Sequence, residues 1–203
     1  MKKIITLLFL SVLFFQQVDA RTIKWKRNES LYRAGFRIGC NIPLTHQFSE
    51  NRTSTRMFSP DFAGYFRVGK LVFGEIGIGY TFQKNRFAID QGTGVYDKYD
   101  EIVEMRFLQI PLRAVGEFEL GEFFSLQPSV GFIYQPLLHV NDNVLGYSKK
   151  NLTNHYFVLT AGVGFSVYFF SFELSYRHFL QNWVPKSDVK RQSTLHLSLG
   201  FQI

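Results

Sequence analysis

The stretch TLHLSLGFQI, residues 194–203, alternates strictly between two kinds of side chain. One set is apolar and comprises Leu195, Leu197, Leu199, Phe201 and Ile203. The other set is polar or small and comprises Thr194, His196, Ser198, Gly200 and Gln202. Because successive side chains of a β-strand point to opposite faces, this period of two predicts a strand with one apolar and one polar face.

The same period recurs in seven further stretches of the chain. They lie within residues 32–39, 62–69, 75–82, 108–115, 124–132, 157–167 and 172–177. In each stretch large apolar residues alternate with glycines, small polar residues or charged residues. Together with 194–203 they predict eight strands, and an even count is typical of a bacterial transmembrane β-barrel.

The connections between these stretches alternate in length. Short ones are expected near 71–73, 117–122 and 169–171. Long ones are expected near 42–60, 84–101, 136–154 and 182–191. Short turns at one end and long loops at the other predict an all-β, eight-stranded antiparallel up-and-down transmembrane barrel over residues 31–203, with both chain ends in the periplasm. The competing fold is a secreted soluble β-sandwich with one solvated face.

Composition favours the barrel. The 203 residues are 46% hydrophobic, 19% charged and 17% aromatic, with 23 Phe. Their mean hydropathy is only −0.04, because outward apolar and inward polar residues cancel. After Ala20 no run of 18 apolar residues occurs, which excludes a helical membrane protein. A single cysteine, Cys40, excludes a disulfide scaffold.

The first twenty residues have the pattern of a secretory signal peptide. Lys2 and Lys3 precede a short apolar run over 4–15, and small or β-branched residues follow at Val18 and Ala20. We expect cleavage between Ala20 and Arg21, a short periplasmic segment over 21–30, and location in the outer membrane of a Gram-negative bacterium. Removing residues 1–20 takes away Lys2, Lys3 and Asp19, which lowers the formal net charge from +7 to +6.

The polar faces carry charges that would lie inside the barrel. They are Arg33, Arg37, Arg67, Glu75, Arg113, Glu173 and Arg177, with Glu117 as a further candidate. An eight-stranded barrel is just wide enough for side chains to fill its interior, and buried charges must be paired. We therefore predict a structural ion-pair network that closes the lumen, the alternative being an ion or solute path.

Aromatic residues suggest girdles at both ends of the apolar wall. The inner one is expected from Phe73, Phe118, Phe123, Phe124, Phe169 and Phe170, and the outer one from Phe87, Tyr134, Tyr156 and Trp183. Two prolines, Pro111 and Pro128, fall inside predicted strands, where each removes a ladder donor. We expect β-bulges at both.

The histidines and the loop lysines do not indicate a metal or catalytic site. His46, His139, His155, His178 and His196 lack metal-ligand spacing, so no metal site, cofactor or catalytic residue is expected. His178 is predicted to face outward, as in lipid A deacylases of the barrel type, but Leu180 stands two residues later where a serine would be needed. The predicted outer loops also carry five cationic residues, which are Lys149, Lys150, Lys186, Lys190 and Arg191. Their expected neighbours are solvent and anionic lipopolysaccharide.

The segments 108–112 (LQIPL) and 172–177 (FELSYR), with the signal peptide and the eight stretches, resemble the PorT-like outer-membrane barrel family of Bacteroidota. Such small barrels are similar to the OmpA/OmpX type. The resemblance covers most of residues 31–203 and implies lipid, lipopolysaccharide and the barrel assembly machinery as partners, not nucleic acid.

Three functions follow as hypotheses. The first is a non-enzymatic structural or surface-interaction barrel that acts through its long outer loops. The second, implied by the family name, is a component of a protein secretion assembly with secretion-system proteins as partners. The third is a lipid-modifying barrel enzyme.

Overall fold

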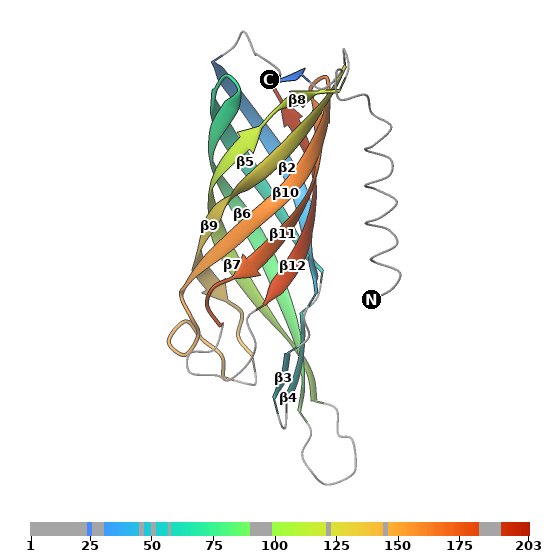
Figure 1. Ribbon diagram of the computed structural model, residues 1–203. Helices are drawn as coiled ribbons and strands as arrows, with labels where there is room; N and C mark the ends of the chain where they lie inside the picture. Colours follow the sequence, from blue (N-terminus) through green and yellow to red (C-terminus); the bar gives the residue numbers. More distant parts are fainter. Residues whose placement is uncertain are drawn as a thin grey trace, which may run out of the picture.

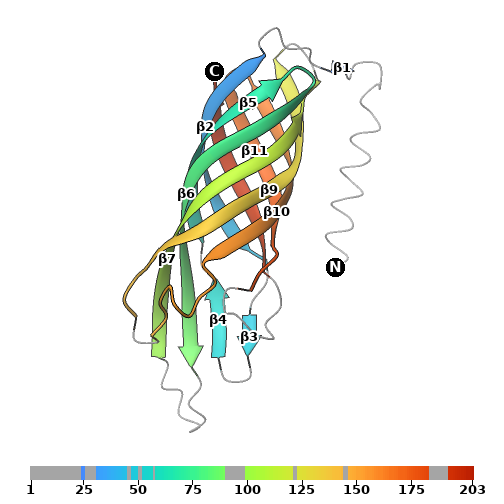
Figure 2. The same cartoon turned by 90° about the vertical axis from the view of Figure 1, so that its left-hand side faces the viewer.

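The chain folds into a closed antiparallel β-barrel (Figures 1 and 2). The computed structural model describes residues 24–25, 31–44, 47–49, 52–56, 58–89, 99–120, 123–143, 146–182 and 192–203. The barrel strands are β2 (Tyr32–Pro43), β5 (Ser59–Gly69), β6 (Val72–Ile89), β7 (Tyr99–Gly116), β9 (Phe124–Val140), β10 (His155–Val167), β11 (Phe170–Phe179) and β12 (Ser193–Gln202). Each pairs with the next, and β12 pairs with β2, which confirms the predicted eight-stranded fold and leaves no open edge as a sandwich would.

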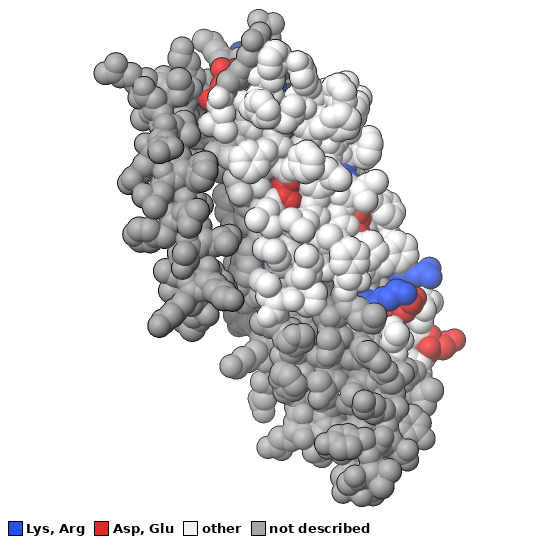
Figure 3. All heavy atoms as spheres, turned by 90° about the vertical axis from the view of Figure 1, so that its right-hand side faces the viewer, with Lys and Arg blue, Asp and Glu red and all other residues white. Residues whose placement is uncertain are grey.

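The two faces of each strand differ as the alternation predicts. Ile38 and Leu199 are 61% and 54% exposed on the outer wall, whereas Arg67 is 3% exposed in the interior. Uncharged side chains cover most of the described part of the face seen in Figure 3. The described residues contain no helix long and apolar enough to cross a membrane. The barrel thus has an apolar outside and, except toward its long-loop end, a polar inside.

The two ends of the barrel differ in loop length, again as predicted. Residues 70–71 and 168–169 form two-residue turns at the end that also holds the C-terminus, at the top of Figure 1. At this short-turn end β8 (Phe118–Glu119) continues the pairing of β7 with β9, and β1 (Lys24–Trp25) pairs with β8. The opposite, long-loop end carries the connections between β9 and β10 and between β11 and β12.

Part of the expected long connections is strand. β6 and β7 stay paired as far as Ile89 and Tyr99. Against the far end of β6 lies β4 (Arg52–Arg56), and β3 (Gln47–Ser49) pairs with β4. These strands extend below the barrel in Figure 2. The long-loop end therefore carries a sheet extension that the sequence pattern did not reveal.

The bulges expected at Pro111 and Pro128 are absent, and these two predictions are wrong. In the β6–β7 ladder the pairs at Pro111 are missing. At Pro128 the partner of β9 changes from β7 to β8. In both places the register is the same before and after the gap. A missing N–H therefore interrupts a ladder locally without inserting a residue. The register shift in the described barrel lies elsewhere, between Arg106 and Phe107, where Leu138 is the extra residue on β9.

Gly77 explains how the ring of Pro111 fits into the lumen. A Cβ built on Gly77 would lie 2.6 Å from the carbonyl oxygen of Gly64 and 3.0 Å from Cγ of Pro111. Only a residue without a side chain allows this approach of three strands. Pro111 accordingly faces inward and is buried.

Candidate functional site

Glu75 is the centre of the charge network inside the lumen. It is fully buried on β6 and contacts three guanidinium groups from three other strands. Its Oε1 lies 2.7 Å from Nη2 of Arg37 and 2.7 Å from Nη2 of Arg113, and its Oε2 lies 2.9 Å from Nε of Arg67. One carboxylate thus ties β2, β5 and β7 to β6.

Glu173 of β11 extends this cluster across the barrel. It pairs with Nη1 of Arg37 at 3.1 Å and with Nη1 of Arg113 at 2.5 Å. Tyr65 lies beside the same guanidinium groups, with its ring centroid 4.2 Å from Cζ of Arg37 and 4.9 Å from Cζ of Arg67. Two carboxylates, three arginines and a tyrosine therefore fill the middle of the lumen.

A second ion pair lies toward the short-turn end. Arg33 donates to Oε2 of Glu117 at 2.9 Å. The other oxygen of Glu117 accepts from Ser125 at 2.9 Å and from Gln127 at 3.3 Å. Arg67 donates to Gln127 at 3.1 Å, which connects this pair to the central cluster.

The fifth predicted arginine, Arg177, belongs to a third group nearer the long-loop end. Its Nη1 lies 2.9 Å from Oδ2 of Asp61 and 2.9 Å from Oδ1 of Asn41. His196 Nε2 lies 3.0 Å from Oδ1 of Asp61. Sequence reasoning missed Asp61, although it continues the inward parity of Ala63, Tyr65 and Arg67 by one more step.

Ser175, His196 and Asp61 have the order of a nucleophile, a base and an acid. Ser175 Oγ lies 3.3 Å from His196 Nδ1, and His196 contacts Asp61 on its other nitrogen. All three side chains are buried, at 1%, 0% and 4% exposure, and Arg177 occupies the second oxygen of Asp61. Acyl transfer needs room for a substrate at the serine, so we assign this chain of contacts to structure.

An apolar cluster of buried side chains lies inside the barrel toward its long-loop end. Its members come from β7, β9, β10, β11 and the loop before β10: Val103, Met105, Phe107, Ile133, Leu137, Leu152, Tyr156, Val158 and Phe179. Val140 and Tyr147 pack against them. The sequence pattern predicts a polar lumen throughout. Its alternating stretch over 108–115 begins at Leu108, so it assigns no face to Val103, Met105 and Phe107. Tyr156 belongs to this apolar plug, so its assignment to the outer girdle is wrong.

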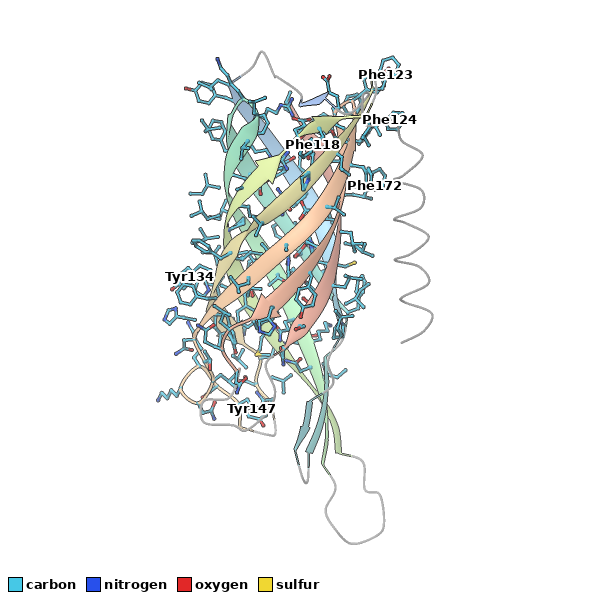
Figure 4. All side chains as sticks on the ribbon, in the orientation of Figure 1. Phe118, Phe123, Phe124, Tyr134, Tyr147 and Phe172 are labelled. Atoms are coloured by element: carbon cyan, nitrogen blue, oxygen red, sulfur yellow. The ribbon has the colours of Figure 1, made fainter. Side chains whose placement is uncertain are left out.

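The other aromatic residues predicted for the two girdles lie largely on the outer wall. Phe123, Phe124, Phe169 and Phe170 are exposed around the short-turn end, and Figure 4 shows Phe118, Phe123 and Phe124 there. Phe73 is instead buried beneath Cζ of Arg33, 5.2 Å from its ring centroid, so its place in the girdle is also wrong. Toward the long-loop end Tyr134 stands on the outer wall and contacts Nδ1 of His155 at 2.7 Å. The side chains of Phe87 and Trp183 lie outside the described residues.

His178 faces the outside, as expected, and has a serine beside it from the neighbouring strand. Ser193 is its direct partner across β11 and β12, and Ser193 Oγ lies 3.0 Å from His178 Nδ1. Tyr176 donates its hydroxyl to the same Oγ at 2.7 Å. Spacing along the chain does not reveal this serine, because strand pairing brings it to the histidine.

Several other sequence candidates lie in a loop or outside the described residues. Lys149 and Lys150 are exposed in a turn at the long-loop end, while His46, Lys186, Lys190 and Arg191 lie outside the described residues, as do Ala20 and Arg21 at the predicted cleavage site. Within the described part of the chain no three His, Cys, Asp or Glu side chains are grouped so that they could hold a metal ion.

Comparison with known proteins gives structural likenesses only. No family model matches the sequence, and no curated protein sequence matches it. The chain is similar to the attachment invasion locus protein Ail of Yersinia pestis, solved with the heparin analogue sucrose octasulfate, at 15% identity over 86% of this chain and 100% of that one (TM-score 0.42).

Two other barrel structures are similar to the chain at comparably low sequence identity. The N-terminal β-barrel domain of OprF from Pseudomonas aeruginosa is 13% identical over 86% of this chain and 98% of that one (TM-score 0.45). The translocator domain of the autotransporter NalP from Neisseria meningitidis is 12% identical over 98% and 97% (TM-score 0.42). No activity of this chain follows from these likenesses.

Proposed function

We propose that the protein is an outer-membrane β-barrel that does not conduct solutes and that acts as a structural or surface-interaction protein through its long-loop end. The observation that carries this is its inverted polarity: Phe, Leu and Ile cover the outside, while Glu75 and its arginines are buried inside. An apolar wall around a whole molecule is unfavourable in water and favourable in hydrocarbon. Because the network and the apolar plug occupy the lumen, the loops are the part that can meet molecules outside the membrane.

Accessibility of the two ends tests the location and the orientation. In a Cys40→Ala background, which removes the chain's single cysteine, Ser148→Cys marks the long-loop end and Lys70→Cys marks a short turn. Both positions are exposed. A membrane-impermeant maleimide should label the first variant in intact cells and the second only after the outer membrane is permeabilised. Equal labelling of both in intact cells, or recovery of the protein in the soluble fraction, would contradict the proposal.

A secretion role is the second candidate, supported by the resemblance of the sequence to the PorT-like family and by the predicted signal peptide. Under this hypothesis the long-loop end or the short-turn end docks other secretion proteins. A deletion strain tests it: loss of secreted cargo with an intact outer membrane favours the secretion role, and unchanged secretion rejects it.

A lipid-modifying enzyme has one contact in its favour, that of His178 with Ser193 on the outer wall. A base within hydrogen-bond reach of a hydroxyl is the first requirement for a serine nucleophile. Among the described residues no carboxylate contacts His178, whereas a serine nucleophile's base is usually oriented by a third group. A fluorophosphonate probe that labels the wild-type barrel but not Ser193→Ala would support an enzyme, and the absence of labelling would reject it.

A further inference from the structure

A cluster of cationic groups lies on the outer wall where the apolar surface ends. Along β6 the outward residues are apolar or glycine up to Phe82, and the next one is Lys84. Along β7 they are apolar or glycine from Gly116 back to Leu108, and the next one is Arg106. The two residues are diagonal neighbours, since Phe82 pairs with Arg106 and Lys84 with Glu104.

The bulge on β9 adds His139 to this cluster. Leu137 points into the apolar plug, and strict alternation would send His139 inward as well. The extra residue Leu138 reverses the alternation, so His139 is exposed directly opposite Arg106 and Val140 packs against the plug. Re-aiming a side chain is a common effect of a bulge. The fold therefore places three nitrogen-bearing side chains from three adjacent strands on one outer patch.

The patch is preorganised. Glu104 holds Nζ of Lys84 at 2.5 Å and is itself held by Nδ2 of Asn141 at 3.1 Å. Arg106 is exposed, with Cζ 6.0 Å from the ring centroid of Phe82, and its charge also acts on the carboxylate of Glu104. On the short-turn side of the patch, Phe82 and Leu138 are exposed on the apolar wall.

We infer that Lys84, Arg106 and His139 form a site for the phosphate of an outer-leaflet glycolipid of the lipid A type. The site rests on the proposed membrane location. A phosphate accepts several charge-assisted hydrogen bonds from a planar guanidinium and an ammonium group. The acyl chains of the same lipid would lie along Phe82, Leu138 and the outward apolar residues between them and the short-turn end. On the other five barrel strands no described Lys or Arg faces outward at this level, so the site occupies one side of the barrel.

Native mass spectrometry of the full mature barrel tests the site. The probes are bisphosphorylated lipid A and the same lipid without its phosphates, titrated against wild type, Lys84→Gln/Arg106→Gln and the control Lys149→Gln/Lys150→Gln, whose lysines are exposed in a loop. Each cation near an anionic surface contributes roughly a fivefold change in affinity, so the double variant should bind phosphorylated lipid A about 25-fold more weakly. The control should change less than about twofold, and the lipid without phosphates should bind all three proteins equally.

Two results would overturn the inference. Equal losses in the double variant and in the control would show that the cations act only through general surface charge. Equal binding of both lipids by wild type would show that phosphate is not recognised. Gel migration with and without boiling checks folding. Wild type that does not insert into lipid would overturn the membrane location and the site together. Inserted protein that shows no preference for the phosphorylated lipid would overturn the site alone.

Discussion

Arg67 and Glu75 face each other directly across β5 and β6, with Nε of the guanidinium 2.9 Å from Oε2 of the carboxylate. The hairpin between them has only two residues in its turn, 70 and 71. This pair is therefore local in sequence, yet it anchors contacts that cross the lumen, since Arg67 also donates to Gln127 and Gln202. A local hairpin thus carries side chains whose contacts join it to strands across the lumen.

Replacing Glu75 by Gln removes the charge that three arginines share. Leaving a buried charge without its partner typically costs about 3–5 kcal/mol, and we expect a loss of stability at least in that range. The fraction of heat-shifted, folded protein on gels as a function of urea concentration measures it. Glu119→Gln, at the half-exposed short-turn end, is the matched control and should change stability by less than about 1 kcal/mol. Similar midpoints for both variants would contradict the central place of Glu75.

The sequence predicted the strands and their faces because both depend on alternation within one stretch. It also placed Arg33, Arg37, Arg67, Glu75 and Arg113 on the inward face. It placed His196 on the polar face of the last strand but did not find Asp61, and the two residues, 135 apart in sequence, meet only after the barrel closes. No local pattern encodes such a cross-barrel pair, although starting the second strand at Asp61 instead of Phe62 would have given it an inward face.

Adding a single methyl group at Gly77 should disturb three strands. The Cβ of Gly77→Ala would lie 2.6 Å from a backbone oxygen, which cannot rotate away. Overpacking of this kind costs about 1–3 kcal/mol. Gly74→Ala is the control on the same strand, because the nearest atom to its new Cβ is 3.9 Å away. Urea midpoints that fall equally for the two variants would refute the packing described for Pro111.

The bulges show a different limit of sequence reasoning. A proline in a strand removes one N–H donor from the ladder. From this loss we predicted a bulge, with one inserted residue, at Pro111 and at Pro128. The structure instead interrupts the ladder there and keeps the register. The actual register shift lies beside Arg106, and its extra residue, Leu138, is neither proline nor glycine. It occurs beside Phe107 and Leu137, which belong to the apolar plug.

Opposite faces of β12 should tolerate substitution differently. Leu199→Arg places a charge on the outer wall, where the cost at mid-membrane is about 2–4 kcal/mol. Ser198→Ala removes one hydroxyl from the interior and should be tolerated. Phe165→Arg on β10 should behave like Leu199→Arg. The yield of membrane-inserted protein is the readout, and equal yields for Leu199→Arg and Ser198→Ala would overturn the assignment of the faces.

Electrical recording in a planar bilayer tests most directly whether the lumen is sealed. Glu75 and Glu173 with their arginines fill its middle, and the cluster around Phe107 lies toward its long-loop end. Purified barrel that shows a boiling-dependent shift on gels, and is therefore folded, should insert into the bilayer without producing current steps. Steady single-channel steps from the same preparation would contradict the sealed lumen and would make a solute path the better account of the protein.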